Sequence, residues 1–162
     1  MMLVDGRAEI GDLDSFLAEV DRVSNETGST IQFFNADYIA GERHLRRAAE
    51  MAERAGDRGT TIARDPAVEL LLYAAGRRQI DRALEMGVSE GSQAVVGVVD
   101  GGNEAAATAA VEDLLATTES VQWGDSETLQ AFFDIGAGEE AVVDGDLESI
   151  VLERVALLAV EQ

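Results

Sequence analysis

Short apolar runs typical of β-strands alternate with segments of helical periodicity along the whole chain. Residues 2–10, 30–34 and 93–99 are the predicted strands, and residues 118–123 are a further candidate. The predicted helices cover residues 12–26, 42–55, 66–75, 77–86, 103–116, 126–133 and 146–160. This pattern predicts an α/β (α+β) fold, with a small mixed or antiparallel sheet packed against about six to seven helices in a single compact domain, residues 1–162. The strands are too few and too irregular for a doubly wound nucleotide-binding fold.

Glycine and proline mark several of the predicted boundaries. Asp65-Pro66 predicts a helix start, with aspartate as the N-cap and proline in the first turn. Gly76 is expected to end that helix, and Gly56 to end the helix before it. Gly6 is expected to form a turn or bulge within the first strand, and a glycine-rich loop is expected over residues 136–145.

The chain is strongly acidic. It contains 32 Asp and Glu residues against 12 basic residues, all of them Arg, and its formal net charge is −20. Repulsion among so many carboxylates would destabilise a compact state in dilute buffer, but at about 1 M salt the Debye length falls to about 3 Å. We therefore expect a halophilic protein adapted to a cytosol at molar salt. An acidic protein that binds a basic partner is the alternative.

The basic residues are concentrated in the middle of the chain. From Arg43 to Arg82, nine arginines stand against six acidic residues, so this window has a net charge of +3 and the rest of the chain −23. If high salt disfavours basic residues in general, a retained cluster requires a local function. We therefore expect the working surface of the protein in this arginine-rich third.

Few catalytic or metal sites can be built from this composition. The chain has no Cys and a single His, so thiolate ligands, cysteine nucleophiles and a histidine cluster are excluded. It also lacks a phosphate-binding glycine motif and a serine nucleophile elbow. No stretch approaches the roughly 18 to 20 apolar residues of a membrane span. We expect a cytoplasmic binding protein without catalytic residues, without a metal or cofactor, and without a membrane partner.

The predicted helix at residues 42–55 has two distinct faces. Arg43, Arg47 and Glu50 share one face, while His44 lies on another among apolar residues. An exposed, salt-bridged stripe above a core stripe explains this pattern, because Glu50 can pair with a neighbouring Arg. A phosphate-facing surface explains it equally well, since Arg binds phosphate bidentately and stacks on bases.

The most specific pattern of the chain lies between Gly41 and Val88. Its later part is a helix ending in Leu-Leu-Tyr-Ala-Ala-Gly, residues 71–76, followed by Arg78-Gln79-Ile80 and then by an alanine and a glycine. This order closely resembles the signature of the PRPK-binding (TPRKB) family in its archaeal form. The segment Gly-Glu-Arg-His-Leu at residues 41–45 resembles the upstream helix of that family. The order of elements is compatible with the resemblance over most of the chain.

The resemblance implies the small accessory subunit of the KEOPS complex, which helps to install a threonylcarbamoyl group on the adenosine beside the anticodon of tRNA. Such a protein is not catalytic; it binds and stimulates the kinase-like ATPase subunit (PRPK-type) and holds the 3′ CCA tail of tRNA. Arg78, Gln79 and Ile80 match the family's arginine-glutamine-isoleucine and form the implied tail-binding site. The other candidate tRNA-binding residues are Arg77, Arg64, His44, Arg43 and Arg47.

Recognition of RNA at molar salt cannot depend on phosphate contacts, because the free energy gained by counterion release shrinks as the salt concentration rises. Base stacking, worth about 1–3 kcal/mol per base, and hydrogen bonds to base edges remain. The guanidinium of Arg78 can stack and donate in pairs, and the amide of Gln79 can read a base edge. Ile80 either supplies an apolar floor for a base or belongs to the core.

The predicted last helix, residues 146–160, is apolar on almost every side, which requires burial all around. Either it is a central core helix or a partner covers one side. The resemblance favours docking of the kinase here, with Ile150, Val151, Arg154, Leu157 and Leu158 as the candidate interface. The alternative function for the whole chain is a small cytosolic enzyme or ligand-binding domain that uses an Arg/carboxylate site.

Overall fold

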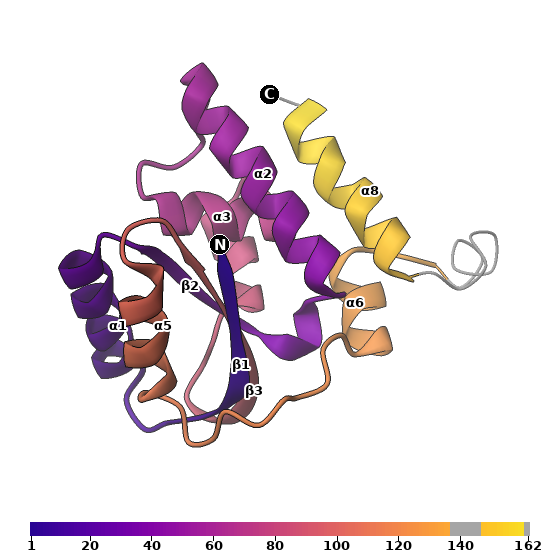
Figure 1. Ribbon diagram of the computed structural model, residues 1–162. Coiled ribbons are helices and arrows are strands. Elements are labelled where there is room, and N and C mark those ends of the chain that lie inside the picture. The colour runs from indigo at the N-terminus through magenta and orange to yellow at the C-terminus, as the bar shows by residue number, and fades with distance from the viewer. Residues whose placement is uncertain (137–146, 161–162) are drawn as a thin grey trace. The chain divides into compact units, whose positions relative to one another are not determined.

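The computed structural model describes residues 1–136 and 147–160, with the side chains of the last helix described as far as Leu158. These residues form seven α-helices and a three-stranded antiparallel sheet, which confirms the predicted mixed fold (Figure 1). They group into two compact units, one from residues 1–36 and 87–122, the other from residues 37–86 and 123–162 as far as described. The single domain remains a prediction.

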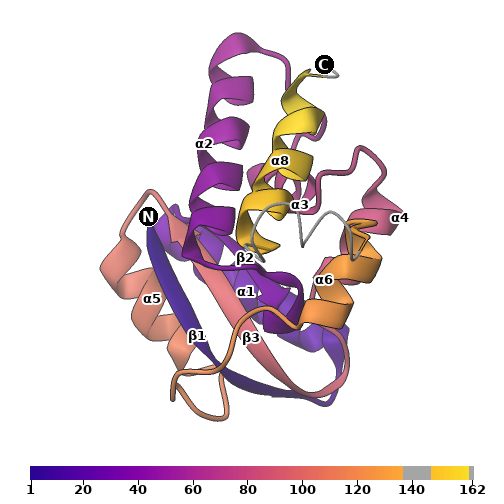
Figure 2. The same cartoon turned by 90° about the vertical axis from the view of Figure 1, so that its right-hand side faces the viewer.

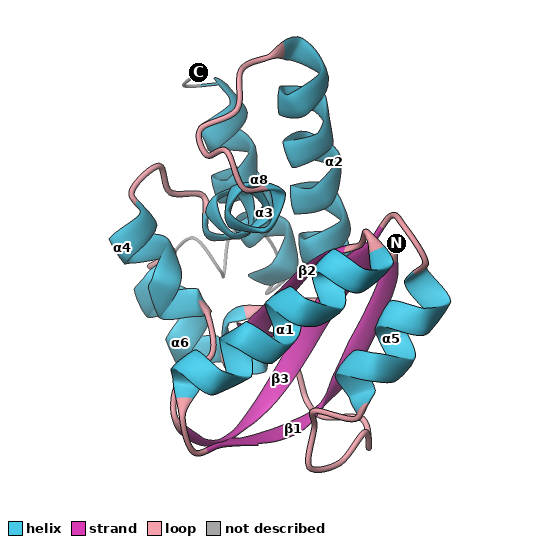
Figure 3. Ribbon diagram, turned by 90° about the vertical axis from the view of Figure 1, so that its left-hand side faces the viewer, coloured by secondary structure: helices cyan, strands magenta, loops and turns pink. Residues whose placement is uncertain are grey.

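The first unit is the sheet with two helices on one face. Its strands are β1 (Met2–Ile10), β2 (Thr30–Asn35) and β3 (Gly91–Asp100), arranged in the order β1-β3-β2, and both pairs are antiparallel. The central strand is β3, whose apolar sequence fits a strand that hydrogen-bonds to a neighbour on both edges. Figure 3 shows α1 (Leu13–Thr27) and α5 (Glu104–Glu112) on the same face of the sheet. They bury an apolar core against β1, β2 and β3.

Three local predictions in this unit are wrong. Gly6 is not a bulge, because it pairs regularly with Val95; a Cβ there would lie 2.1 Å from the carbonyl oxygen of Thr117, so close approach of that segment requires glycine. Residues 118–123 form no strand, and only Thr117 makes an isolated bridge to β1. The helix predicted over residues 103–116 ends earlier, at Glu112.

The second unit is helical. Its helices are α2 (Glu42–Arg58), α3 (Pro66–Ala75), α4 (Ile80–Ala83), α6 (Ser126–Phe132) and α8 (Leu147–Val160). Short 3-10 turns cover Ala36–Tyr38, which spans the boundary between the two units, and Leu84–Met86. Figures 1 and 2 show α2 and α8 side by side, and α3 packs against both.

The predicted cap of α3 is confirmed, but two other boundaries are wrong. The side chain of Asp65 accepts from the backbone N–H of Ala67, with Pro66 in the first turn. Gly56 does not stop α2, which continues to Arg58 and ends where Gly59 adopts a left-handed conformation (φ 71°). The helix predicted over residues 77–86 is reduced to α4 and one 3-10 turn. The predicted loop at 136–145 falls, after Gly136, outside the described residues.

Candidate functional site

The segment between α3 and α4 turns sharply and then runs extended. Gly76 is left-handed (φ 63°) and its N–H bonds to carbonyls of the last turn of α3, while the N–H of Arg77 bonds to the carbonyl of Leu72. Gln79 is extended (φ −89°, ψ 122°) and forms the N-cap position of α4. The turn at Gly76 thus interrupts the predicted helix, because a residue in that conformation cannot continue it.

This geometry places the three best tail-binding candidates on the surface. Arg78 and Gln79 are exposed, and Arg78 makes no ion pair or hydrogen bond with a described residue. Ile80 is 49% exposed, so its interpretation as a core residue is wrong. Leu84, one helical turn further on, is 58% exposed, so two large apolar side chains face solvent beside the polar pair. Exposed apolar side chains grouped in this way favour a contact surface.

A pocket of about 280 Å³ opens beside this segment. The carboxyl end of α3 and the residues that follow it form one wall, and α8 forms another. Its described lining residues are Ala75, Gly76, Arg77, Arg78, Gln79, Phe133, Arg154, Leu157 and Leu158. Three arginines, a glutamine and a phenylalanine therefore line a single cavity. The structure brings together candidates for tRNA binding and candidates for partner binding that are far apart in sequence.

Two of the three pocket arginines are anchored to the carboxyl end of α6. The guanidinium of Arg77 donates to the carbonyl of Phe132 and lies 5.2 Å from the centroid of that ring. Arg154 donates through Nε to the carbonyl of Phe133 (3.2 Å) and through Nη2 to that of Asp134 (3.5 Å). The last carbonyls of a helix lack intrahelical partners and carry partial negative charge, so both cations stabilise this end of α6.

His44 is a structural residue and not a surface contact. It is fully buried, and the backbone N–H of Ala40 donates to its Nδ1 at 3.0 Å. The ring proton is therefore on Nε2, which donates to the carbonyl of Ala74 at 2.7 Å. Burial lowers the pKa of His44 to about 4, although the bond to Ala74 opposes this shift. The neutral imidazole joins α2 to the end of α3, and the prediction that it contacts tRNA is wrong.

The candidate partner-binding residues of α8 divide into two groups. Ile150, Val151 and Leu158 are at most 2% exposed, so these three are wrong as partner contacts: they belong to the core of the chain. Leu157 is 51% exposed, and Arg154 is partly exposed at the rim of the pocket. One side of α8 is therefore core and another faces solvent, and docking of a partner on the solvent side stays a prediction.

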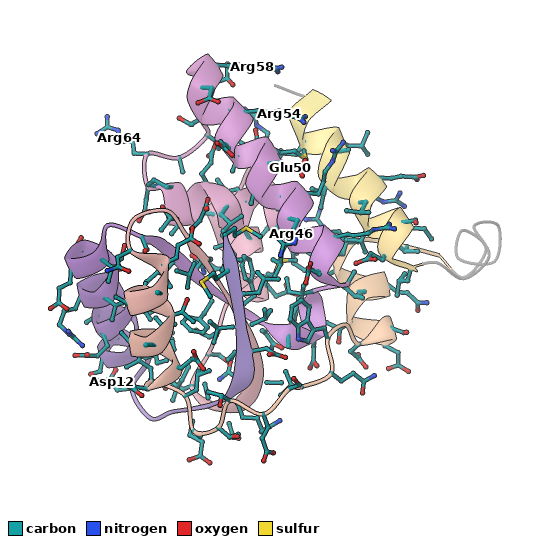
Figure 4. All side chains as sticks on the ribbon, in the orientation of Figure 1. Asp12, Arg46, Glu50, Arg54, Arg58 and Arg64 are labelled. Atoms are coloured by element: carbon teal, nitrogen blue, oxygen red, sulfur yellow. The ribbon has the colours of Figure 1, made fainter. Side chains whose placement is uncertain are left out.

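Arg43 and Arg47 line a different groove, between α2 and α8, and neither borders the pocket at Gly76. Arg64 is exposed in the loop before α3 and makes no ion pair or hydrogen bond with a described residue. Figure 4 shows the arginines that follow one another along α2, with Arg64 on the loop after it. The structure thus brings only part of the candidate set into one site.

Two residues that matter for the site were missed. Phe133 forms part of the pocket wall and lies edge-on to His44, with ring centroids 5.7 Å apart. Glu69 is 3% exposed and its carboxylate accepts backbone N–H bonds from Ile62 and Ala63 at 2.8–3.2 Å, which fixes the loop that carries Arg64. A glutamate in the first turn of an otherwise apolar helix was the available signal for this role.

The described residues contain no group of three or more His, Cys, Asp or Glu side chains arranged to hold a metal ion. Among the described helices, none has the length and apolar character needed to cross a membrane.

The comparison with known proteins gives one clear result. No curated protein matches the chain. The family model described as "Kinase binding protein CGI-121" matches residues 14–159, which include the whole Gly76 pocket and both faces of α8. A match over this share of the sequence shows the relationship directly: the chain belongs to the CGI-121 family of kinase binding proteins.

Proposed function

We propose that this protein is a non-catalytic accessory subunit of the KEOPS complex, which acts in the cytoplasm of a halophilic archaeon. In this role it binds the PRPK-type, kinase-like ATPase subunit and the 3′ CCA tail of tRNA, and so supports threonylcarbamoyl modification of the adenosine next to the anticodon. Membership of a kinase-binding family supports the first contact. The pocket at Gly76 supports the second.

The observation that carries the tail-binding proposal is the exposed, extended segment Arg78-Gln79-Ile80 at the edge of that pocket. An unpaired base offers a π-face and its Watson–Crick edge, whereas stacking and pairing occupy both in a base within a duplex. The guanidinium of Arg78 has no described partner, so it can stack on a base at little cost. Gln79 can donate and accept at a base edge, and Ile80 provides apolar contact.

Arg77 and Arg154 prepare the pocket for an anionic, planar ligand. Arg77 is held by the last carbonyl of α6 and Arg154 by the carbonyls of Phe133 and Asp134 just after it, so the position of each guanidinium is set before a ligand arrives. A preorganised donor loses less conformational entropy on binding than a free side chain does. This arrangement suits recognition at molar salt, where contact geometry matters more than long-range attraction.

The kinase-docking proposal rests on the solvent-facing side of α8. Because Ile150, Val151 and Leu158 are buried, deleting this helix would unfold the unit and could not test an interface. A single substitution at Leu157 is the sharper test, with tRNA affinity measured beside kinase affinity because Leu157 also lines the Gly76 pocket. Leu17 on α1 is a matched control, since it is also a helical leucine and is 43% exposed against 51% for Leu157.

The decisive experiment measures tRNA binding by fluorescence anisotropy in at least molar KCl. It compares intact tRNA with tRNA that lacks its CCA end, using wild-type protein and Arg78→Glu. We expect each change to weaken binding by about tenfold or more, as expected for the loss of one stacked base and its hydrogen bonds. The two changes together should be little worse than either alone, because both remove the same contact. Arg58→Glu, an exposed arginine in the last turn of α2, is the control.

Equal affinity for both RNAs in both proteins would refute tail binding at this site. For the kinase, Leu157→Glu should weaken association measured by calorimetry, and Leu17→Glu should leave it unchanged. If wild-type protein does not associate with the kinase-like subunit at all, the proposed function is wrong.

A further inference from the structure

A second cavity, of about 560 Å³, lies in the groove between α2 and α8. We call it the α2/α8 groove and define it by Arg43, Arg46 and Arg47 of α2 and by Leu152 and Ala156 of α8. The two α8 side chains are partly exposed and apolar, and the three arginines are exposed. The groove thus has an apolar floor beside a row of guanidinium groups. Figures 1 and 2 show the two helices that form it side by side.

Arg43 and Arg47 of the α2/α8 groove make only long ion pairs with carboxylates of the same chain, whereas Arg46 pairs closely with Glu42 at 2.8 Å. Arg43 lies 3.4 Å from Glu148, and its side chain is 60% exposed. Arg47 lies 3.5 Å from Glu50, and its side chain is 47% exposed. Ion pairs this exposed contribute about 0–1 kcal/mol, and salt weakens them further. Carboxylates of a partner can therefore replace these intramolecular pairs at little cost.

Helix α2 is also electrostatically unlike the other described helices. It carries five arginines against four acidic residues, whereas each of the other described helices has a net charge of zero or below. The net charge of the chain is −20, so among its described helices α2 repels an acidic partner least. A partner adapted to the same salt concentration also carries many carboxylates, so a locally cationic groove reduces the charge repulsion between the two proteins when they bind.

The apolar floor of the groove favours a protein segment over RNA. Leu152 and Ala156 offer apolar surface, which a phosphate backbone cannot use. A protein segment can use the whole groove, because an apolar side chain can cover the floor while its carboxylates meet the arginines. Glu50 and Glu153 also line the groove, so the carboxylates of the segment are expected on the side of Arg43, Arg46 and Arg47.

We propose that the α2/α8 groove is the docking site for an acidic segment of the kinase-like subunit. One apolar side chain of that segment packs on Leu152 and Ala156, and its carboxylates pair with Arg43 and Arg47. This inference rests on the proposed function, which supplies the partner, and it reassigns Arg43 and Arg47 from tRNA to protein. Ion pairs enclosed between the groove and the docked segment are screened less at molar salt than the exposed intramolecular pairs, because salt screens buried charges much less than exposed ones.

The test uses the full chain and the intact kinase-like subunit, with affinity measured by calorimetry at molar KCl. Arg43→Ala with Arg47→Ala removes the cations, and Ala156→Phe fills the groove without changing charge. Arg58→Glu alters an arginine of the same helix that does not line the groove. We expect the first two proteins to bind the kinase about tenfold or more weakly and the third to bind within about twofold of wild type.

Circular dichroism of each variant shows whether it is folded, so that a loss of binding is attributed only to a folded protein. A stronger form of the test is rescue: Arg47→Glu should recover affinity with a kinase in which one acidic residue of the docking segment is changed to Arg. If wild type binds the kinase and both groove variants bind it equally well, the groove is not the docking site, although the proposed function stands. If the double variant loses tRNA affinity instead, the groove is an RNA surface and the inference is overturned.

Discussion

The buried imidazole of His44 makes the stability of the protein depend on pH in a calculable way. The pKa of His44 is lowered to about 4 in the folded state, against about 6.5 for an exposed histidine. The unfolded chain therefore binds more protons than the folded chain between these two pKa values. As the pH falls through this window, the contribution of His44 to the free energy of unfolding is lost progressively.

The size of this effect follows from the two pKa values. Between pH 7 and pH 5, protonation of the unfolded histidine lowers the free energy of unfolding by about 2 kcal/mol. Carboxylates also titrate toward the acid end of this range, so the wild-type curve alone cannot isolate the histidine. His44→Gln provides the reference, because His44 is the only histidine in the chain.

The assay is urea unfolding at molar KCl, followed by circular dichroism and by the fluorescence of Trp123, the single tryptophan. His44→Gln should be less stable than wild type at pH 7 by about 1–3 kcal/mol, because it cannot make both buried backbone hydrogen bonds of the imidazole. The difference between the two proteins should then shrink by about 2 kcal/mol on going to pH 5. A constant difference across this range would show that the imidazole is not held neutral, and would refute the reasoning.

Two further predictions concern the segments that shape the site. Glu69→Ala should lower the free energy of unfolding by about 2 kcal/mol, because two partly buried backbone N–H groups lose their acceptor. Glu53→Ala on the exposed surface of α2 should change it by less than about 0.5 kcal/mol, and equal effects in chemical denaturation would contradict this role of Glu69. Gly76→Ala and Gly59→Ala both place a side chain at positive φ and should each cost about 1 kcal/mol. Gly76→Ala should cost more in the same unfolding assay, because its Cβ would lie 3.3 Å from the Arg154 carbonyl oxygen, whereas Gly59 faces open space. A smaller cost for Gly76→Ala would show that the backbone of α8 shifts to make room for the added methyl group.

Much of the fold could be predicted from local patterns. The strands of the sheet and the start of α3 at Asp65-Pro66 follow from periodicity and capping chemistry, which act over a few neighbouring residues. Glycines were harder, because a glycine is compatible with several conformations. Gly56 stands inside α2 at an exposed position, and Gly6 stands inside β1, where the close approach of Thr117 requires glycine.

The side chains of α8 show why the candidate site was only partly predictable. A helix that is apolar all around has no preferred face, so its sequence cannot say which side meets the rest of the chain. The structure selects Ile150, Val151 and Leu158 for the core and leaves Leu157 in solvent. Likewise, the sequence places Arg77 and Arg78 side by side, but only the structure anchors Arg77 on α6 and leaves Arg78 without a described partner.

The sequence by itself determined the types of element, the arginine-rich third, the shortage of catalytic chemistry and the resemblance to a kinase-binding family. These depend on residue identity and on short-range order. Only the tertiary structure decided that His44 is buried between α2 and α3, that α8 has a core side and a solvent side, and that Arg154 joins Gln79 around one pocket. The physical reason is that burial and proximity belong to pairs of elements far apart in the chain, and no local pattern fixes how such elements meet.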